Sequence, residues 1–247
     1  QVGINDLGTV AADTVLPIAG GSTTAWASEV ATVTNSGADF DKITLTPKRL
    51  SAVANLSNVI LAQNGPAAEA SVMRDLGRNV GVQIDAAMFG STNVPQAPGC
   101  IAATTGVLTF SEATSLDVAG DLLAAVQKIA DNHGLDGNLQ FVNSWELYSP
   151  IQKAALVSSV APLFSDGMIL GYKSNFSAAP AKNAGTSGDG LFGDFSRVYF
   201  ATFGPTNILV DPYTNAADNE VRLVLNNHYD FAVASGASFV KYTTLSA

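Results

Sequence analysis

The fold is decided by the stretch at residues 193–245, GDFSRVYFATFGPTNILVDPYTNAADNEVRLVLNNHYDFAVASGASFVKYTTL. Residues 220–233 alternate between apolar and polar side chains with a period of two, the pattern of a strand with one buried face. The apolar positions are Val221, Leu223, Leu225, Tyr229, Phe231 and Val233, and the polar ones are Glu220, Arg222, Asn226, His228 and Asp230. Further strands are predicted at 197–203, 206–210 and 238–243, with a turn at 211–219. The carboxyl-terminal part of the chain is therefore a β region built around one long strand.

Upstream, residues 25–57 have the pattern of a long two-stranded hairpin. The first strand is predicted at 26–34, NSGAD at 35–39 supplies turn residues, and a second apolar run begins at Lys42. The apolar phase of this run changes at 47–49, where a proline cannot donate to a sheet, so we expect a bulge or bend there. An isolated hairpin is marginally stable in water, so we expect this one to pack against a partner. Residues 1–24 have no sustained period and are predicted to form an extended arm.

The clearest helix is PAAEASVMRDLGRNVGVQIDAAMFG, residues 66–90. Its apolar residues recur at spacings of three and four, and they are Met73, Leu76, Val80, Ile84 and Ala87. Proline suits the first turn of a helix and glycine suits the end, so the prediction is a helix over 67–89. Gly77 and Gly81 lie one turn apart inside it, and we expect them to allow close packing against a neighbouring strand.

The middle of the chain mixes helices and strands. Thr114 and Asp117 form a capping-box pattern that begins a second helix, which runs through Leu123, Val126 and Ile129 to Gly134. A strand is predicted at 139–143 and a short helix at 145–157. Residues 158–190 are predicted to be mostly loop, with one or two strands around 168–174.

The composition excludes several classes of function. The net charge is −9 and no cluster of Lys and Arg occurs, which argues against a protein that neutralises nucleic-acid phosphates or binds an anionic membrane. Charged residues make up 13% of the chain, against roughly 25% in ordinary soluble proteins. Richness in Ala, Gly, Ser and Thr would explain this, but we favour surface buried against other subunits. No transmembrane stretch is present, and the single cysteine, Cys100, excludes a disulfide framework and a thiolate metal site.

A search for catalytic chemistry finds no candidate. Gly188, Gly190 and Gly193 spell G-x-G-x-x-G, but a strand follows them, whereas a dinucleotide site needs a helix there. His228 lies on the polar face of the long strand and is expected to be a surface or interface residue. We therefore predict no catalytic residue, no cofactor and no metal ion. An acidic β-rich surface or adhesin domain remains an alternative, as does a hydrolase whose carboxylate pair is assembled only by folding.

The order of these elements resembles the major capsid proteins of tailed bacteriophages, the Hong Kong 97 fold shared with encapsulin shells. The resemblance lies in the hairpin at 25–57 leading into the helix with its MFG end, and in the GDFS segment followed by the long strand and the final strand. It implies an α+β chain, divided into an N-arm at 1–24, an E-loop hairpin at 25–62, a peripheral (P) domain at 63–114 with the spine helix at 67–89, an axial (A) domain at 115–195, and a return at 196–247 to the P-domain sheet and the C-terminal strand.

The resemblance also implies a function without catalysis. Copies would assemble as pentamers and hexamers into an icosahedral shell around double-stranded DNA that is bound without sequence specificity, in the host cytoplasm, to give a virion capsid. Portal, scaffold and maturation protease would act during assembly, a cement or decoration protein could bind afterwards, and no membrane is involved. The first residue, Gln1, fits proteolytic trimming, which counts against the near alternative of an encapsulin nanocompartment.

The contacts between subunits are expected at charged or aromatic residues of the hairpin, the helix and the 211–219 turn. They are Trp26, Glu29, Lys42, Lys48, Arg49, Arg74, Arg78, Asp211, Asn215, Asp218 and Glu220. The namesake phage joins an E-loop lysine to a P-domain asparagine with the help of a glutamate. Lys42 and Lys48, with Asn215, Asn219 and Glu220, supply the same residue types. Because such residues are common in loops, we expect noncovalent contacts instead, and mature particles that dissolve into 25 kDa bands on denaturing gels would exclude a cross-link.

Overall fold

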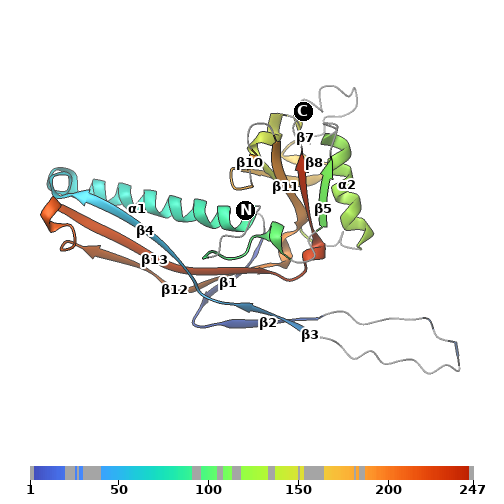
Figure 1. Ribbon diagram of the computed structural model, residues 1–247, viewed down its shortest axis with the longest axis horizontal. Coiled ribbons are helices and arrows are strands. Elements are labelled where there is room, and N and C mark those ends of the chain that lie inside the picture. The colour runs from blue at the N-terminus through green and yellow to red at the C-terminus, as the bar shows by residue number, and fades with distance from the viewer. Residues whose placement is uncertain are drawn as a thin grey trace.

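The molecule is elongated, with a long helix lying over a sheet, a second domain at one end, and a hairpin that projects below (Figure 1). The computed structural model describes residues 3–19, 26, 28–29, 40–90, 96–104, 108–112, 118–132, 137–149, 151–152, 164–180, 182–183 and 187–244. The predicted strand at 26–34, the capping box at 114–117 and the end of the predicted helix at 145–157 lie wholly or largely outside these residues.

The sheet beneath the helix, called the long sheet, has the strand order β1-β12-β13-β4. Its strands are β1 (Asn5–Val10), β12 (Val198–Asp211), β13 (Glu220–Val233) and β4 (Lys48–Ser57). The predicted long strand is confirmed as β13. The two strands predicted on either side of residue 204 form one strand, β12, with a shift of register between Phe203 and Asn207. Gly204 adopts a φ of 72° at this shift, which an L side chain rarely does, so the chain bends without leaving the sheet.

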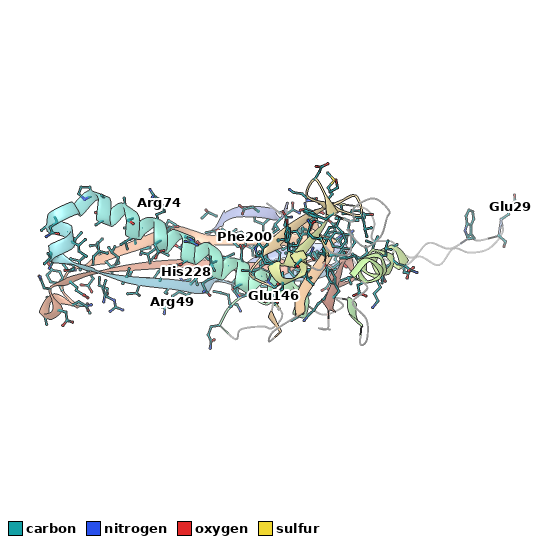
Figure 2. All side chains as sticks on the ribbon, turned by 90° about the horizontal axis from the view of Figure 1, so that it is seen from above. Glu29, Arg49, Arg74, Glu146, Phe200 and His228 are labelled. Carbon is teal, nitrogen blue, oxygen red and sulfur yellow. The ribbon has the colours of Figure 1, made fainter. Side chains whose placement is uncertain are left out.

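The long helix, α1, spans Asn58–Phe89 and ends at Gly90 as predicted. Its start was predicted wrongly, because the helix begins before Pro66 rather than at it. The Ser57 hydroxyl accepts a hydrogen bond from the Val59 N–H at 3.3 Å and so caps the helix. Pro66 lies inside the helix, where it removes one backbone donor, and the first turns of α1 bend away from the rest (Figure 2).

One face of α1 packs on the long sheet. Leu76 and Val80 are buried against Leu56, Leu223 and Leu225. The apolar face predicted for β13 is therefore the face that contacts the helix.

Gly77 and Gly81 of α1 do not pack as predicted. A Cβ atom built on Gly77 or Gly81 would meet no atom within 4 Å, so neither glycine touches a strand of its own chain. Both lie on the outward face of the helix.

The domain at the other end is built on a second sheet, called the broad sheet, with the order β5-β14-β11-β6-β9-β8-β7, and β10 pairs with β11. Its strands are β5 (Leu108–Glu112), β14 (Phe239–Thr244), β11 (Ser187–Asp194), β6 (Leu139–Ser144), β9 (Tyr172–Ser177), β8 (Met168–Ile169), β7 (Phe164–Ser165) and β10 (Lys182–Asn183). Residues 158–190 therefore contain more strand than predicted.

The pairing in this sheet joins distant parts of the chain. The segment at 196–247 contributes β12 and β13 to the long sheet and β14 to the broad sheet, where β14 lies between β11 and β5. The C-terminal strand therefore ties the two halves of the molecule together.

Helix α2 (Val118–Asp131) covers the broad sheet. Its buried apolar residues are Leu122, Ala125 and Ile129. Ile129 is buried as predicted and Val126 packs against the core, but the predicted Leu123 is 55% exposed. Short 3-10 turns complete the described fold, and they lie at Ile101–Ala103, Trp145–Leu147, Phe195–Arg197, Ala216–Asp218 and Gly236–Ser238.

The G-x-G-x-x-G pattern has a packing role in β11. A Cβ atom on Gly190 would lie 2.3 Å from the ring of Tyr242, and one on Gly193 would lie 2.4 Å from the ring of Phe239. Each glycine thus makes room for an aromatic ring of β14.

The projecting hairpin pairs β2 (Thr14–Ala19) with β3 (Phe40–Leu45). This corrects the predicted hairpin over 25–57, because its amino-terminal strand comes from the predicted arm. The second half of the predicted hairpin is β4, which pairs with β13 instead. The partner of a strand depends on how its side chains are buried against residues distant in the sequence. The apolar side chains at the even positions of β4 are buried under α1. The phase change predicted at 47–49 coincides with the break between β3 and β4.

Candidate contact surfaces

The described residues contain no group of three or more His, Cys, Asp or Glu side chains placed to hold a metal ion. None of the helices in the described part of the chain is long and apolar enough to cross a membrane. The features that remain are surfaces, and they lie mainly on the long sheet, its end turn and the hairpin.

The turn between β12 and β13 gathers four of the predicted residues: Asp211, Asn215, Asp218 and Glu220. The carboxylate of Asp211 accepts a hydrogen bond from the Thr214 hydroxyl and from the N–H groups of Tyr213 and Thr214, the latter two at 2.9 and 3.2 Å. These bonds, with that of the hydroxyl first, lower the pKa of Asp211 below its ordinary value. The carboxylate of Asp211 therefore organises the turn itself, which gives this residue a structural role.

The same turn is attached to the start of α1. The Asn58 N–H donates to the Asn219 carbonyl at 3.0 Å, and the Asn58 side-chain amide donates to the Asn219 side-chain oxygen at 2.8 Å. Asn219 takes the left-handed conformation with φ of 58°, which asparagine tolerates better than most residues. The helix start and the turn thus form one rigid tip, with Tyr213 85% exposed on it.

The face of the long sheet away from α1 carries an apolar row between two polar rows. Val53 of β4 lies opposite Val224 of β13, which lies opposite Leu209 of β12. Val53 and Leu209 are 48% and 55% exposed. The neighbouring rows on this face are Asn55, Arg222 and Asp211 on one side and Ser51, Asn226 and Asn207 on the other. An apolar strip bordered by polar groups is typical of a surface that a protein partner covers.

Asp230 joins the long sheet to the hairpin. Its carboxylate accepts a hydrogen bond from the Thr46 N–H at 2.7 Å, at the point where the chain passes from β3 to β4. Burial raises the pKa of Asp230, and the hydrogen bonds from the Thr46 and Phe231 N–H groups and the charge of Lys48 oppose part of that rise. The angle at which the hairpin leaves the sheet is therefore set partly by one buried carboxylate.

The structure places the remaining predicted residues at separate positions. Lys48 and Arg49 lie at the start of β4, next to the carboxyl-terminal half of α1, while Lys42 is exposed on β3. Arg74 and Arg78 are exposed on the outward face of α1, and neither lies within ion-pair distance of a carboxylate among the described residues. Figure 2 shows Arg74 and Arg49 on opposite sides of the long body, the part of the molecule formed by α1 and the long sheet.

The hairpin residues lie far from the tip formed by α1 and the turn. Trp26 is fully exposed, Glu29 is exposed, and Glu29 lies at the far end of the molecule in Figure 2. Lys42 and Asn215 therefore lie on well-separated elements, β3 and the β12–β13 turn (Figure 1). A contact between them would have to join two copies of the chain.

An aromatic cluster lies on the end domain, which is the domain built on the broad sheet, and it was not predicted from the sequence. The ring of Phe176 lies 5.5, 5.2 and 5.7 Å from those of Trp145, Tyr148 and Phe164. Trp145 and Tyr148 are 56% and 41% exposed, so the cluster reaches the surface. Their spacing of three was visible in the sequence, but Phe176 joins them only through the pairing of β9 with β6. Val224 was also missed, and its apolar side chain on the otherwise polar face of β13 was a signal for the exposed row.

A long helix on a twisted sheet, a second α/β domain and an outstretched hairpin define a shell subunit with the Hong Kong 97 capsid fold. The model of the phage capsid family matches residues 6–244, and the chain belongs to that family. The predicted α+β fold and the predicted class, a tailed-phage major capsid protein, are therefore confirmed. The search of curated proteins found no match.

Solved structures with this fold span almost the whole chain. The structure titled "Capsid of native GTA particle computed with C5 symmetry" has a TM-score of 0.77 at 17% identity, covering 99% of this chain and 89% of the other. A structure from Mycobacterium phage Bobi has a TM-score of 0.75 at 16% identity, covering 99% and 89%. One from Gordonia phage Cozz has a TM-score of 0.72 at 14% identity, covering 99% and 85%. The chain is a structural capsid protein of a virion shell.

Proposed function

We propose that the chain assembles as pentamers and hexamers into a closed icosahedral shell that encloses double-stranded DNA, and that it has no catalytic role. The observation that carries this proposal is the projecting hairpin. Strands β2 and β3 pair only with each other among the described residues, although such a hairpin alone is marginally stable in water. Leu16 and Leu45 at its base pack against Ala201 and Phe203 of the same chain, but the rest of the described hairpin has no such cover. That part needs a surface from outside the chain.

The exposed side chains of the hairpin support contact with a second copy. Phe40 is 66% exposed and Val15 is 54% exposed, and both lie in paired strands rather than in turns. A hairpin of one copy that reaches another copy makes a head-to-tail contact, and such contacts form a ring when the rotation between copies closes. The structure of the similar GTA capsid was computed with C5 symmetry, which is a cyclic symmetry.

The charge of the chain fits a container better than a nucleic-acid binder. Because each chain has a net charge of −9, the shell would enclose DNA without binding its phosphates. The division into N-arm, E-loop, P domain and A domain also belongs to this proposal. So do the partners that the family resemblance implies: a portal, a scaffold, a maturation protease and a cement protein, acting in the host cytoplasm.

Electron microscopy of the purified protein, with nuclease-protected DNA measured in the same particles, tests the proposal. Closed shells with rings of five and six copies and protected double-stranded DNA are expected. Shells that hold a protein cargo instead would favour an encapsulin-type compartment. Uniform monomers at all concentrations would contradict the proposal.

A further inference from the structure

The most exposed large apolar side chain in the described part of the molecule is Trp26, and an acidic residue follows it closely. Trp26 is fully exposed, and Glu29 lies three residues later, also exposed. Both belong to the segment that joins the paired ends Ala19 and Phe40 of the hairpin. An indole ring held in water costs free energy unless a partner covers it, and Trp is the residue most enriched at the energetic centres of interfaces.

A cavity under the carboxyl-terminal half of α1 has the size and lining for an aromatic ring. Its volume is about 190 Å³, and its apolar walls come from Leu50, Ile84, Phe200, Tyr229 and Phe231. A cavity of about 150 Å³ with apolar walls accepts benzene in a well-studied case. The cavity is open on one side, so that a side chain from outside can enter it.

Two cations also line this cavity. Lys48 and Arg49 start β4, and neither lies within ion-pair distance of a carboxylate among the described residues, although the charge of Lys48 acts on Asp230. Arg49 is exposed, and Figure 2 shows it beside His228 on the long body. An apolar cavity with cations beside it fits an aromatic side chain that has a carboxylate nearby.

We propose that Trp26 of one copy inserts into this cavity of a second copy, while its Glu29 pairs with Arg49 or Lys48 there. The proposal rests on the proposed assembly into a shell and names the contact that the hairpin makes. Three residues span at most roughly 10 Å, so the carboxylate can stay at the mouth while the indole is buried. The occupant is a second copy because Glu29 lies at the far end of the molecule from the long body of its own chain (Figure 2).

Two other exposed aromatic residues, Tyr213 and Trp145, fit this cavity less well, and Phe40 is held in the paired strand β3. Tyr213 lies on the tip, where the neighbouring carboxylate of Asp211 is held by hydrogen bonds within the turn. Trp145 already packs against Tyr148 and Phe176. Trp26 alone among these residues combines full exposure with an exposed carboxylate.

Tryptophan fluorescence tests the insertion directly. The chain has two tryptophans, so the variant Trp145→Phe leaves Trp26 as the only reporter. In particles of this variant, the Trp26 emission should move to shorter wavelength and become resistant to quenching by acrylamide, relative to the unassembled chain. Particles in which Trp26 remains fully quenchable would overturn the proposal while leaving the shell function intact.

Substitutions on both sides of the contact give a second test. Ala87→Phe fills the cavity from α1, and Ala70→Phe on the exposed side of the same helix is its matched control. We expect Ala87→Phe and Trp26→Ala each to raise the protein concentration needed for assembly by about tenfold or more, with Ala70→Phe near wild type. Equal assembly of all three variants and the wild type would overturn the proposal.

Charge reversal tests the ion pair. Glu29→Lys should impair assembly, and adding Arg49→Glu and Lys48→Glu should restore part of it, since the attraction is re-formed with opposite signs. If the losses of assembly simply add in the combined variant, Glu29 does not take part in the contact.

A peptide separates this inference from the shell function if no particles form. The peptide of residues 22–33, STTAWASEVATV, is titrated with the Trp26→Phe/Trp145→Phe chain, so that only the peptide fluoresces. A blue shift that Ala87→Phe abolishes supports the inference even if the shell function fails. A peptide emission unchanged at millimolar protein overturns the inference.

Discussion

The end domain and the long body of this chain bury their side chains very differently. In the end domain, Phe141, Phe192, Ile129 and Ile169 are completely buried between α2 and the broad sheet. On the long body, α1 covers Leu223 and Leu225 on one face of the long sheet but leaves Val210 beside them 51% exposed, and the opposite face leaves Leu209 55% exposed. The end domain therefore has a closed core of its own, whereas the long body and the hairpin leave apolar side chains exposed, which we propose other copies cover.

This difference predicts that the two regions respond differently to mutation. A change in the end domain should lower the stability of the single chain. A change on the open surfaces of the long body should leave the single chain stable and impair assembly.

Phe192→Ala should have the largest effect. Its ring is fully buried and lies 4.2 Å from that of Phe141 and 5.2 Å from that of Tyr172. Loss of a buried phenylalanine costs about 3–5 kcal/mol through lost transfer energy and the cavity left behind. Urea unfolding of the unassembled chain measures this. A loss of less than about 1 kcal/mol would contradict a closed core there.

Gly190→Ala should have the next largest destabilising effect, whereas Gly77→Ala should stabilise the chain. The added methyl on Gly190 would lie 2.3 Å from the Tyr242 ring, which is 2% exposed and has no room to move. Overpacking of this kind costs about 1–3 kcal/mol. The same change at Gly77 meets open space on a helix and should stabilise the chain by up to about 1 kcal/mol. Thermal unfolding of both variants measures the contrast, and equal signs would contradict it.

Asp230 should show a smaller effect that depends on the side chain chosen. Asp230→Ala leaves the Thr46 N–H without its acceptor and should cost about 1 kcal/mol or somewhat more. Asp230→Asn keeps one acceptor oxygen and removes the charge that burial disfavours, so near neutral pH it should cost less than Asp230→Ala.

The pH dependence of Asp230 follows from its raised pKa. The folded chain takes up this proton at a higher pH than the unfolded chain, whose pKa is near 3.8. The contribution of Asp230 to stability therefore rises as pH falls through the folded pKa toward 3.8, and it is lost as pH rises. Wild type and Asp230→Asn should converge in stability on acidification. A gap that widens in acid would contradict this.

Leu209→Ser should have the smallest effect on the single chain, within about 0.5 kcal/mol, because the side chain is largely exposed. It should nevertheless weaken assembly, since Leu209 belongs to the open apolar row with Val53 and Val224. Thr202→Ser on the same strand is a suitable control. Light scattering during assembly measures the difference between the two variants. Normal assembly of Leu209→Ser would show that this row does not contact another copy.

Local patterns in the sequence predicted local structure well. The bounds of β13 and the end of α1 at Gly90 followed from alternation and from a terminal glycine. The start of α1 could not be predicted this way, because Ser57 caps it and Asn219, distant in the sequence, holds Asn58.

Partners in space were not predictable from local pattern. The alternation of residues 48–57 predicts a strand, but it does not distinguish a hairpin neighbour from β13, which lies far along the chain. Individual contact residues were chosen from their type alone, and the structure shows how differently they are placed. Asp211 is bound within its own turn, whereas Trp26 is open to solvent. The cavity next to Lys48 and Arg49 depends on α1, β4 and β13 together.

The central claim is that the hairpin and the open face of the long body are covered by other copies of the same chain. Cryo-electron microscopy of assembled particles tests it most directly, because it shows what lies against β2, β3 and the Val53–Val224–Leu209 row. The account predicts closed shells in which a neighbouring subunit contacts both surfaces. Particles in which both surfaces face solvent, or a protein that stays monomeric at high concentration, would contradict it.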